Sequence, residues 1–335
     1  MLSDFLNYNF CERHYVLVAE DLKIFSGKLG TFDNFDWTFK KRQMDTYGFP
    51  ASIASKIDIS QYGFKLIPCP IGNYLNHNEP NKYYYSLMEA PLQYNENAKS
   101  KYRKKLGLPE NGAIILVTSA TWQETYKHYP NVVDFINASN KCFEKVLEKI
   151  SENSLIIYVG SKHLINIDLD KTNIKFINNI PPKTFDEYVL ACDVFISRNI
   201  TSTTLAKIAI SGIPTLVLKN SLRINKDNQF DERFKLTNFV ANAIKDCKEI
   251  YPYRMFPVGW FSFLEPILLN NPYMDIVVEE ELFDINSILN KIDKLINNNK
   301  YREELRIKAN EYRKGLDKLD KPEKILNCLM KRSTV

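Results

Sequence analysis

The chain has 335 residues, of which 44% are hydrophobic and 25% charged, and its formal net charge is +5. This composition is typical of a globular protein and excludes a disordered or fibrous chain, and the length leaves room for two domains. Lysine and arginine are spread along the sequence without a basic stripe, so we expect no nucleic-acid partner.

The six cysteines lie far apart and form neither a CxxC motif nor a Cys/His cluster, so the sequence predicts no metal site and no bound cofactor. Reduced and mostly buried thiols fit this spacing. No apolar run reaches the roughly 18 residues of a membrane span, and no signal-peptide pattern opens the chain. We therefore expect a soluble, cytoplasmic protein without a membrane span.

Residues 1–108, the first predicted domain, contain separate apolar pieces rather than a repeating series of strands and helices. Residues 31–37 (TFDNFDW) either line a ligand pocket or form a loop core sealed by Asx turns. In the pocket interpretation, aromatic rings stack on the ligand and carboxylates bind its hydroxyls; the residues concerned are Phe35, Trp37, Asp33 and Asp36. The basic stretch 101–105 is typical of a solvated helix face.

Residues 109–285 form the second predicted domain, in which short apolar strands alternate with amphipathic helices. The predicted strands are 113–119, 154–160, 174–177, 194–197 and 215–218, and the predicted helices are 132–150 and 184–191. This alternation predicts an α/β domain with a parallel, doubly wound sheet. Ligands of such sheets bind beyond the carboxyl ends of the strands, so loops 118–126, 160–163 and 197–204 are the candidate site.

The loop before residue 205 carries four consecutive hydroxyl side chains at the start of a predicted helix: Thr201, Ser202, Thr203 and Thr204. Hydroxyls, unpaired N–H groups and the positive end of the helix dipole together suit a phosphate or pyrophosphate. The alternative is that the hydroxyls only cap the helix.

Residues 248–284 are rich in proline and aromatic residues and lack helical or strand periodicity, which predicts a packed irregular insertion near a cleft or interface. Residues 286–335 are predicted to be helical. One apolar stripe recurs there at three- and four-residue spacing, formed by Leu305, Ala309, Tyr312, Leu316 and Leu319.

Residues 176–218 (FINNIPPKTFDEYVLACDVFISRNITSTTLAKIAISGIPTLVL) resemble the GT-B glycosyltransferases, in the branch of the UDP-glycosyltransferases and the lipid II N-acetylglucosaminyltransferase. The order of strand, proline-ended segment, helix, strand, small-residue loop, helix and Gly-x-Pro carries the resemblance. It implies an α/β, GT-B-like fold with a Rossmann-type C-terminal domain that binds a nucleotide-sugar. Residues 1–108 are then a partial acceptor-side domain, incomplete or reduced, and we expect its first strands and helices to be missing.

The resemblance also implies donor-binding residues. These are Ser119 and Thr121 near the phosphates, Ile180 at the base, Arg198, Thr201, Ser202, Thr203 and Thr204 at the pyrophosphate, and Lys207 where the family often keeps a glutamate for the ribose. A lysine only donates hydrogen bonds, so Lys207 either changes ribose recognition or meets a phosphate. Arg198 adds charge at the phosphates or is a surface arginine paired with a carboxylate. Asn199 and Ile200 replace the usual glycines, which predicts a less close approach of the backbone to a ligand.

An inverting transfer needs a base for the acceptor hydroxyl, and none of the four histidines stands where the family keeps its catalytic one. The candidates are Asp4, His14, Asp36 and Asp45, with helix capping as the alternative role of Asp4.

The expected function is metal-independent transfer of a sugar from a nucleotide-sugar, in this branch a UDP-sugar, to an unknown small-molecule, glycan or protein acceptor. Two alternatives stay open. One is a catalytically silent GT-B-like protein that binds a nucleotide or a partner protein, and the other is a sugar-nucleotide epimerase or hydrolase.

Overall fold

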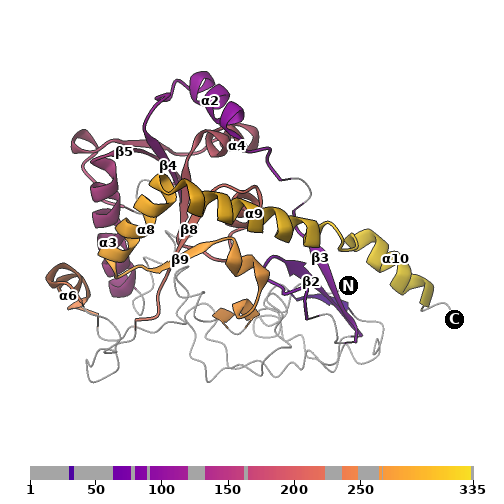
Figure 1. Ribbon diagram of the computed structural model, residues 1–335. Helices are drawn as coiled ribbons and strands as arrows, with labels where there is room; N and C mark the ends of the chain where they lie inside the picture. Colours follow the sequence, from indigo (N-terminus) through magenta and orange to yellow (C-terminus); the bar gives the residue numbers. More distant parts are fainter. Residues whose placement is uncertain are drawn as a thin grey trace. The chain divides into compact units, whose positions relative to one another are not determined.

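The computed structural model describes residues 30–33, 63–76, 80–88, 91–119, 133–161, 165–222, 236–247, 264–265 and 267–332 (Figure 1). These residues form an α/β protein with two parallel sheets. The chain divides into two compact units. The first unit is Met1–Glu89, Leu264–Met274 and Glu311–Val335, and the second is Ala90–Phe263 and Asp275–Asn310. Residues 90–108 thus fall in the second unit, and the C-terminal helices are divided between the two units, unlike the three-part division expected from the sequence.

The first unit contains a three-stranded parallel sheet of order β1-β2-β3. Its strands are β1 (Gly30–Phe32), β2 (Phe64–Cys69) and β3 (Lys82–Ser86). Helix α10 (Pro322–Arg332) buries Ile325 against Leu66 and Tyr85 of this sheet. Apolar contact between helix and sheet therefore stabilises this unit.

The second unit contains a six-stranded parallel sheet of order β6-β5-β4-β7-β8-β9. Its strands are β4 (Ala113–Thr118), β5 (Ser154–Val159), β6 (Ile174–Ile177), β7 (Val194–Ser197), β8 (Thr215–Lys219) and β9 (Val278–Glu281). If these six strands are numbered 1 to 6 in chain order, their order in the sheet is 3-2-1-4-5-6, which is the order of doubly wound dinucleotide-binding folds. The strand order reverses between β4 and β7, where Ile115 pairs with Val194.

Helices cover both faces of this sheet. One face carries α3 (Val133–Ser151), α6 (Asn238–Ile244) and α8 (Ile285–Asn297), which share one apolar core with alternate residues of β4, β5, β7 and β8. On the other face lie α4 (Pro182–Ala191) and α5 (Thr203–Ile210), and α2 (Glu96–Lys105) packs on α4. Burial on both faces explains why these strands are almost continuously apolar.

Helix α9 (Asn299–Leu316) confirms four of the five residues of the predicted apolar stripe, since Leu305, Ala309, Tyr312 and Leu316 are buried. Leu319, the fifth, lies beyond the end of the helix and is half-buried. The five strands and two helices predicted for the second domain are also confirmed within about two residues. Irregular structure over 248–284 was predicted, and this is wrong at its end, where Val278–Glu281 forms the edge strand β9. Two short helices are η6 (Leu169–Lys171) and η7 (Pro272–Asp275), and residues 264, 265, 267 and 268 are also helical. Residues 248–263 lie outside the described part of the chain.

Candidate functional site

All six strands of the second unit run parallel, so their carboxyl ends share one edge of the sheet. The reversal of strand order between β4 and β7 opens a crevice in such sheets, because the connections that follow the two strands lead to opposite faces. Ser119 follows β4 and the segment 198–202 follows β7. These segments therefore occupy the position where doubly wound folds bind ligands.

The loop between β7 and α5 is organised by its own side chains. The hydroxyl of Ser197 accepts a hydrogen bond from the N–H of Asn199 (3.1 Å). Asn199 Oδ1 accepts from both the N–H (3.0 Å) and the hydroxyl (2.7 Å) of Thr201. An asparagine that accepts two residues ahead forms an Asx turn, which fixes the chain where the family resemblance implied glycine.

Ser202 caps helix α5. Its hydroxyl accepts from the N–H of Leu205 (3.3 Å), and its carbonyl accepts from the N–H of Ala206 (3.0 Å). The first N–H groups of a helix have no partner within the helix, and those of Thr203 and Thr204 stay open to a ligand or water among the described hydrogen bonds. The capping alternative thus holds for Ser202.

The four hydroxyl residues of this loop differ in their surroundings. The Thr201 hydroxyl is bound to Asn199, whereas Thr203 is exposed and Thr204 is half-buried. Ile200, by contrast, is only 1% exposed. Its bulk is therefore packed inside the unit, and the less close approach of the backbone to a ligand stays a prediction.

Arg198 is 2% exposed, so it is not the surface arginine considered from the sequence. Its Nη1 donates to Oδ1 of Asn140 (2.7 Å), and its Cζ lies 4.5 Å from the centre of the Phe143 ring. Burial lowers the pKa of the guanidinium, and the neighbouring Tyr158 and Glu144 raise it in part. Asn140 and Phe143 both belong to α3, so the arginine side chain points toward that helix.

Ser119 and Gly160 bring the ends of β4 and β5 into contact. The N–H of Ser119 donates to the carbonyl of Val159 (3.1 Å), and the Ser119 hydroxyl is buried. Gly160 has a φ of +141°, and a Cβ on it would lie 2.4 Å from the Ser119 carbonyl oxygen. Burial raises the pKa of Tyr158, while the Arg198 charge and hydrogen bonds with Ser119 and Arg198 lower it. The Ser119 hydroxyl therefore lies among buried polar groups.

Lys207 and Asp186 form an ion pair between α5 and α4, with Nζ and Oδ1 2.6 Å apart. Both side chains are partly exposed, at 34% and 29%. Asp186 lies in the first half of α4 and Lys207 lies in the last turn of α5, and both helices start at the carboxyl edge of the sheet. Ile180, half-buried, lies between β6 and α4 at the same edge.

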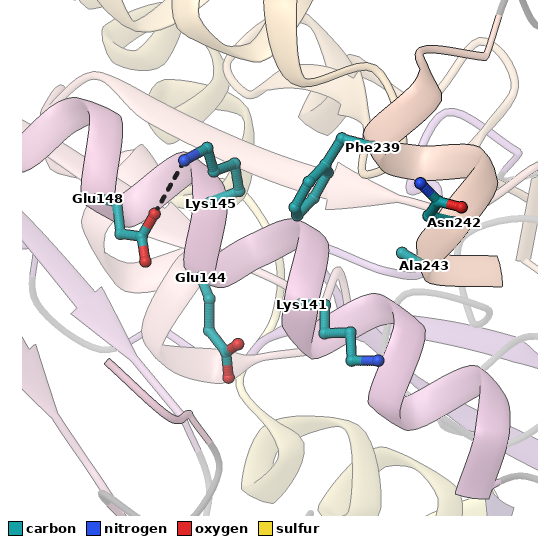
Figure 2. A pocket seen from close by; sticks show the side chains of 7 residues that line it. All are labelled: Lys141, Glu144, Lys145, Glu148, Phe239, Asn242 and Ala243. Carbon is teal, nitrogen blue, oxygen red and sulfur yellow. Dashed lines mark hydrogen bonds and ion pairs between the residues drawn. The ribbon is translucent and has the colours of Figure 1, made fainter. Parts of the chain in front are cut away.

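A pocket of about 310 Å³ lies elsewhere, between α3 and α6 (Figure 2). It is lined by Lys141, Glu144, Lys145, Glu148, Phe239, Asn242 and Ala243. Its lysines and glutamates alternate, and Lys145 pairs with Glu148 at 3.1 Å. Such a mixed lining does not select an anion, and none of the predicted donor-binding residues contributes to it.

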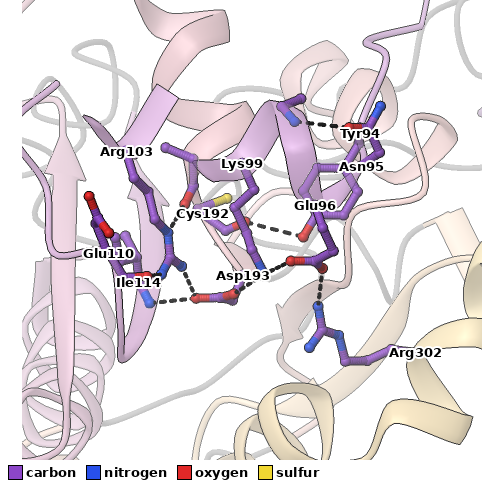
Figure 3. A network of polar contacts seen from close by, with 12 residues as sticks. Tyr94, Asn95, Glu96, Lys99, Arg103, Glu110, Ile114, Cys192, Asp193 and Arg302 are labelled. Carbon is purple, nitrogen blue, oxygen red and sulfur yellow. Dashed lines mark hydrogen bonds and ion pairs between the residues drawn. The ribbon is translucent and has the colours of Figure 1, made fainter. Parts of the chain in front are cut away.

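A polar network occupies the opposite, amino edge of the sheet (Figure 3). Asp193, just before β7, accepts from the N–H of Ile114 (2.7 Å) and from Nη2 of Arg103 (2.6 Å). Arg103 is 3% exposed. The prediction of a solvated face for 101–105 is therefore wrong at this residue, because α2 turns Arg103 inward onto Asp193. The network joins α2, β4 and β7.

The sequence matches the family of unknown function DUF6365 over residues 1–334. The chain belongs to this family. No curated protein matches the sequence.

Three solved structures illustrate the structural similarities. Sucrose-phosphate synthase from Thermosynechococcus elongatus has 11% sequence identity and a TM-score of 0.43, with 91% of this chain and 67% of that chain covered. WaaG, a glycosyltransferase involved in lipopolysaccharide biosynthesis, has 13% identity and a TM-score of 0.40, with 91% and 78% covered. A Listeria monocytogenes protein provisionally named UDP-N-acetylglucosamine 2-epimerase has 10% identity and a TM-score of 0.39, with 83% and 62% covered. At TM-scores below 0.5, these similarities do not by themselves assign an activity to the chain.

The predicted catalytic candidates lie outside the described residues, as does one donor-binding candidate; they are Asp4, His14, Asp36, Asp45 and Thr121. Phe35 and Trp37 lie outside them too, whereas Asp33 is buried directly after β1. Within the described ranges no group of three or more His, Cys, Asp or Glu side chains is placed to hold a metal ion. No helix there has the length and apolar character needed to cross a membrane.

The sequence analysis did not name several residues that the structure places near these loops, among them Asn140, Phe143, Tyr158 and Asp186. Only the side-chain direction of Arg198 could have been inferred from the sequence. Residues alternate between the two faces along β7, which places Arg198 on the same face as Val194 and Ile196.

Proposed function

We propose that the protein is a glycosyltransferase whose second unit binds a nucleotide-sugar, in the first instance a UDP-sugar, at the carboxyl edge of its six-stranded sheet. The observation that carries the proposal is the junction between β7 and α5. It lies beside the reversal of strand order, its loop is fixed by Asn199, and it leaves two N–H groups open at a helix N-terminus. Diphosphates bind such N-termini because N–H groups and the helix dipole both favour negative charge.

In this proposal the diphosphate contacts the N–H groups and hydroxyls of Thr203 and Thr204. The same contacts stabilise the charge that develops on the departing nucleoside diphosphate, so the reaction needs no metal ion. The nucleotide base lies near Ile180. The base that takes the proton of the acceptor hydroxyl is one of Asp4, His14, Asp36 and Asp45.

A nucleotide-binding protein without transferase activity is the second candidate. Lys207 stands where the resembling family often keeps a glutamate, and Asp186 already pairs with it. An ammonium group cannot accept the hydrogen bonds of ribose hydroxyls. This departure favours binding without turnover more than it favours an epimerase or hydrolase.

Calorimetric titration with UDP and UDP-sugars tests the proposal. Changing both Thr203 and Thr204 to valine should weaken UDP binding by about 1–3 kcal/mol, because hydrogen bonds to charged oxygens are lost while shape is kept. Thr172→Val is the matched control, since Thr172 precedes β6 at the amino edge and should leave the affinity unchanged.

Absence of UDP binding by the unmodified protein would contradict both candidates. Release of free UDP from a UDP-sugar that an added acceptor stimulates would select the transferase. Release without an acceptor would select a hydrolase, and binding without release would select the second candidate.

A further inference from the structure

Two buried arginines stand at opposite edges of the six-stranded sheet. Arg103, at the amino edge, donates to the carbonyls of Ala191, Glu110 and Gly112 and to the Asp193 carboxylate (Figure 3). It joins the segments that enter β4 and β7. Arg198, at the carboxyl edge, is the first residue after β7. The two side chains are similarly buried, at 3% and 2% exposure.

The direction of the Arg198 side chain separates it from the donor loop. Alternate residues of β7 point to opposite faces, and Val194 and Ile196 share the core of α3. Arg198 continues this alternation and reaches Asn140 and Phe143 of α3. Its main chain, however, begins the loop that leads to α5 on the other face. The guanidinium thus lies on the α3 face of the sheet, whereas the main chain of Arg198 starts the loop that leads to α5 on the other face.

The surroundings of Arg198 include residues of α3 and of β5. Tyr158 of β5 is buried beside both Arg198 and Ser119, which lower its pKa in part, and Ser119 follows β4. Asn140 lies on α3, the helix between β4 and β5. A planar guanidinium held by a 2.7 Å hydrogen bond and a stacked ring has little rotational freedom. The end of β7 is therefore anchored to α3 through one side chain.

We propose that Arg198 is a positioning residue, which ties the end of β7 to α3 through Asn140 and Phe143 and so fixes the loop and the first turn of α5. It acts through the main chain and does not itself contact the diphosphate. The effect on donor binding rests on the proposed function, whereas the effect on the loop does not.

UDP titration of four variants separates this role from a direct electrostatic one. Asn140→Leu removes the partner of Arg198 on α3, and Arg198→Lys keeps the positive charge but loses the planar stack. Both should weaken UDP binding about threefold to thirtyfold, the range of residues that act through others. Asn140→Asp keeps an acceptor for the guanidinium and should bind UDP within about twofold of the unmodified protein. Arg103→Lys, the matched control at the amino edge, should leave UDP affinity unchanged.

A direct electrostatic role predicts the reverse order. Arg198→Lys would then retain UDP affinity, and Asn140→Asp would weaken it because the new carboxylate neutralises the guanidinium. That pattern would overturn the proposal, as would unchanged affinity in both Asn140→Leu and Arg198→Lys.

Hydrogen exchange of the ligand-free protein tests the same role without UDP. Amides of residues 199–205 should exchange faster in Asn140→Leu and Arg198→Lys than in the unmodified protein, and at the unmodified rate in Arg103→Lys. Equal exchange in all four proteins would overturn the proposal. If the unmodified protein does not bind UDP, the proposed function fails, and the exchange rates alone decide the role of Arg198. Asn140→Leu, outside the loop itself, keeps the test decisive if Arg198→Lys does not fold.

Discussion

Asp186 and Lys207 form a charge pair between α4 and α5, and α5 is the helix that follows the loop proposed to bind the diphosphate. The pair is about one-third exposed, so solvent screens it and each partner can exchange its contact for another at modest cost. A lysine released from Asp186 can donate to a phosphate, and a carboxylate released from Lys207 can accept from sugar hydroxyls. Substitution of each residue in turn can therefore show which of the two side chains contacts the ligand.

We predict that Lys207 is the partner that meets the phosphates. Lys207→Met should weaken UDP binding and Asp186→Asn should strengthen it, each about twofold to fivefold, because exposed charge pairs contribute up to about 1 kcal/mol. Calorimetry of both variants, repeated at high salt where the difference should shrink, measures this. Weaker binding in Asp186→Asn with no change in Lys207→Met would show instead that the carboxylate contacts the ribose.

Side-chain direction at these positions could not be predicted from the sequence. Asp186 and Lys207 are paired across two helices, and the partners of Arg198 lie on α3, far earlier in the chain. An arginine that follows a strand is ordinarily exposed, since burial of its charge is costly without partners. The hydroxyl-rich helix start was predicted, because capping chemistry is local to a few residues.

At the scale of elements, the ends of β4 and β5 approach each other closely at Gly160. Its φ of +141° is strained for any residue with a side chain, and a Cβ would collide with the Ser119 main chain. Gly107, after α2, also has a positive φ (+63°), but a Cβ there meets nothing within 4 Å. Comparison of alanine substitutions at Gly160 and Gly107 thus distinguishes the cost of a steric collision from the cost of a positive φ.

We predict that Gly160→Ala lowers the free energy of unfolding by about 2–3 kcal/mol or more, since strain and collision act together. Gly107→Ala should cost only about 1 kcal/mol, the penalty of the left-handed conformation alone. Urea unfolding followed by circular dichroism measures both. Equal losses in the two variants would contradict the close approach.

The strands of the second unit were predictable because each is a continuous apolar run bounded by breakers, as in AIILVT and VFIS. Strand β9 was not, since its sequence VEEE carries three glutamates that only an edge strand tolerates. The stretch 101–105 was predicted to be a solvated helix face because the other residues of α2 are exposed or half-buried, and only Arg103 is buried. In each case the missing information was the identity of the neighbouring element.

At the scale of the whole molecule, the chain combines two α/β units, each with a parallel sheet. The described residues that the sequence predicted to bind the donor all belong to the second unit; they are Ser119, Ile180, Arg198, Thr201, Ser202, Thr203, Thr204 and Lys207. A ligand that binds only the folded protein stabilises it according to its concentration relative to Kd. Donor binding should therefore be visible in the thermal unfolding of the full chain.

We predict that UDP at about one hundred times its Kd adds about 2.7 kcal/mol to the free energy of unfolding of the second unit and raises its Tm accordingly. Because no metal takes part in the proposed site, EDTA should leave the shift unchanged. Thermal unfolding with UDP, alone and with EDTA or Mg²⁺, measures this. A shift that appears only with Mg²⁺ would contradict metal-independent binding.

The reversal of strand order between β4 and β7 also bears on how the protein folds. Strand β4 pairs with β5, its neighbour in the sequence, on one side, and with β7, three strands later, on the other. The chain between β4 and β7 is longer than that between β4 and β5, so its closure loses more entropy before the strands form stabilising contacts. The β4–β7 pairing should therefore form late in folding. The edge proposed to bind the donor is then among the last parts of the second unit to be assembled. Under the proposed function, a nascent chain should acquire nucleotide affinity only after β7 and α5 have been synthesised and docked.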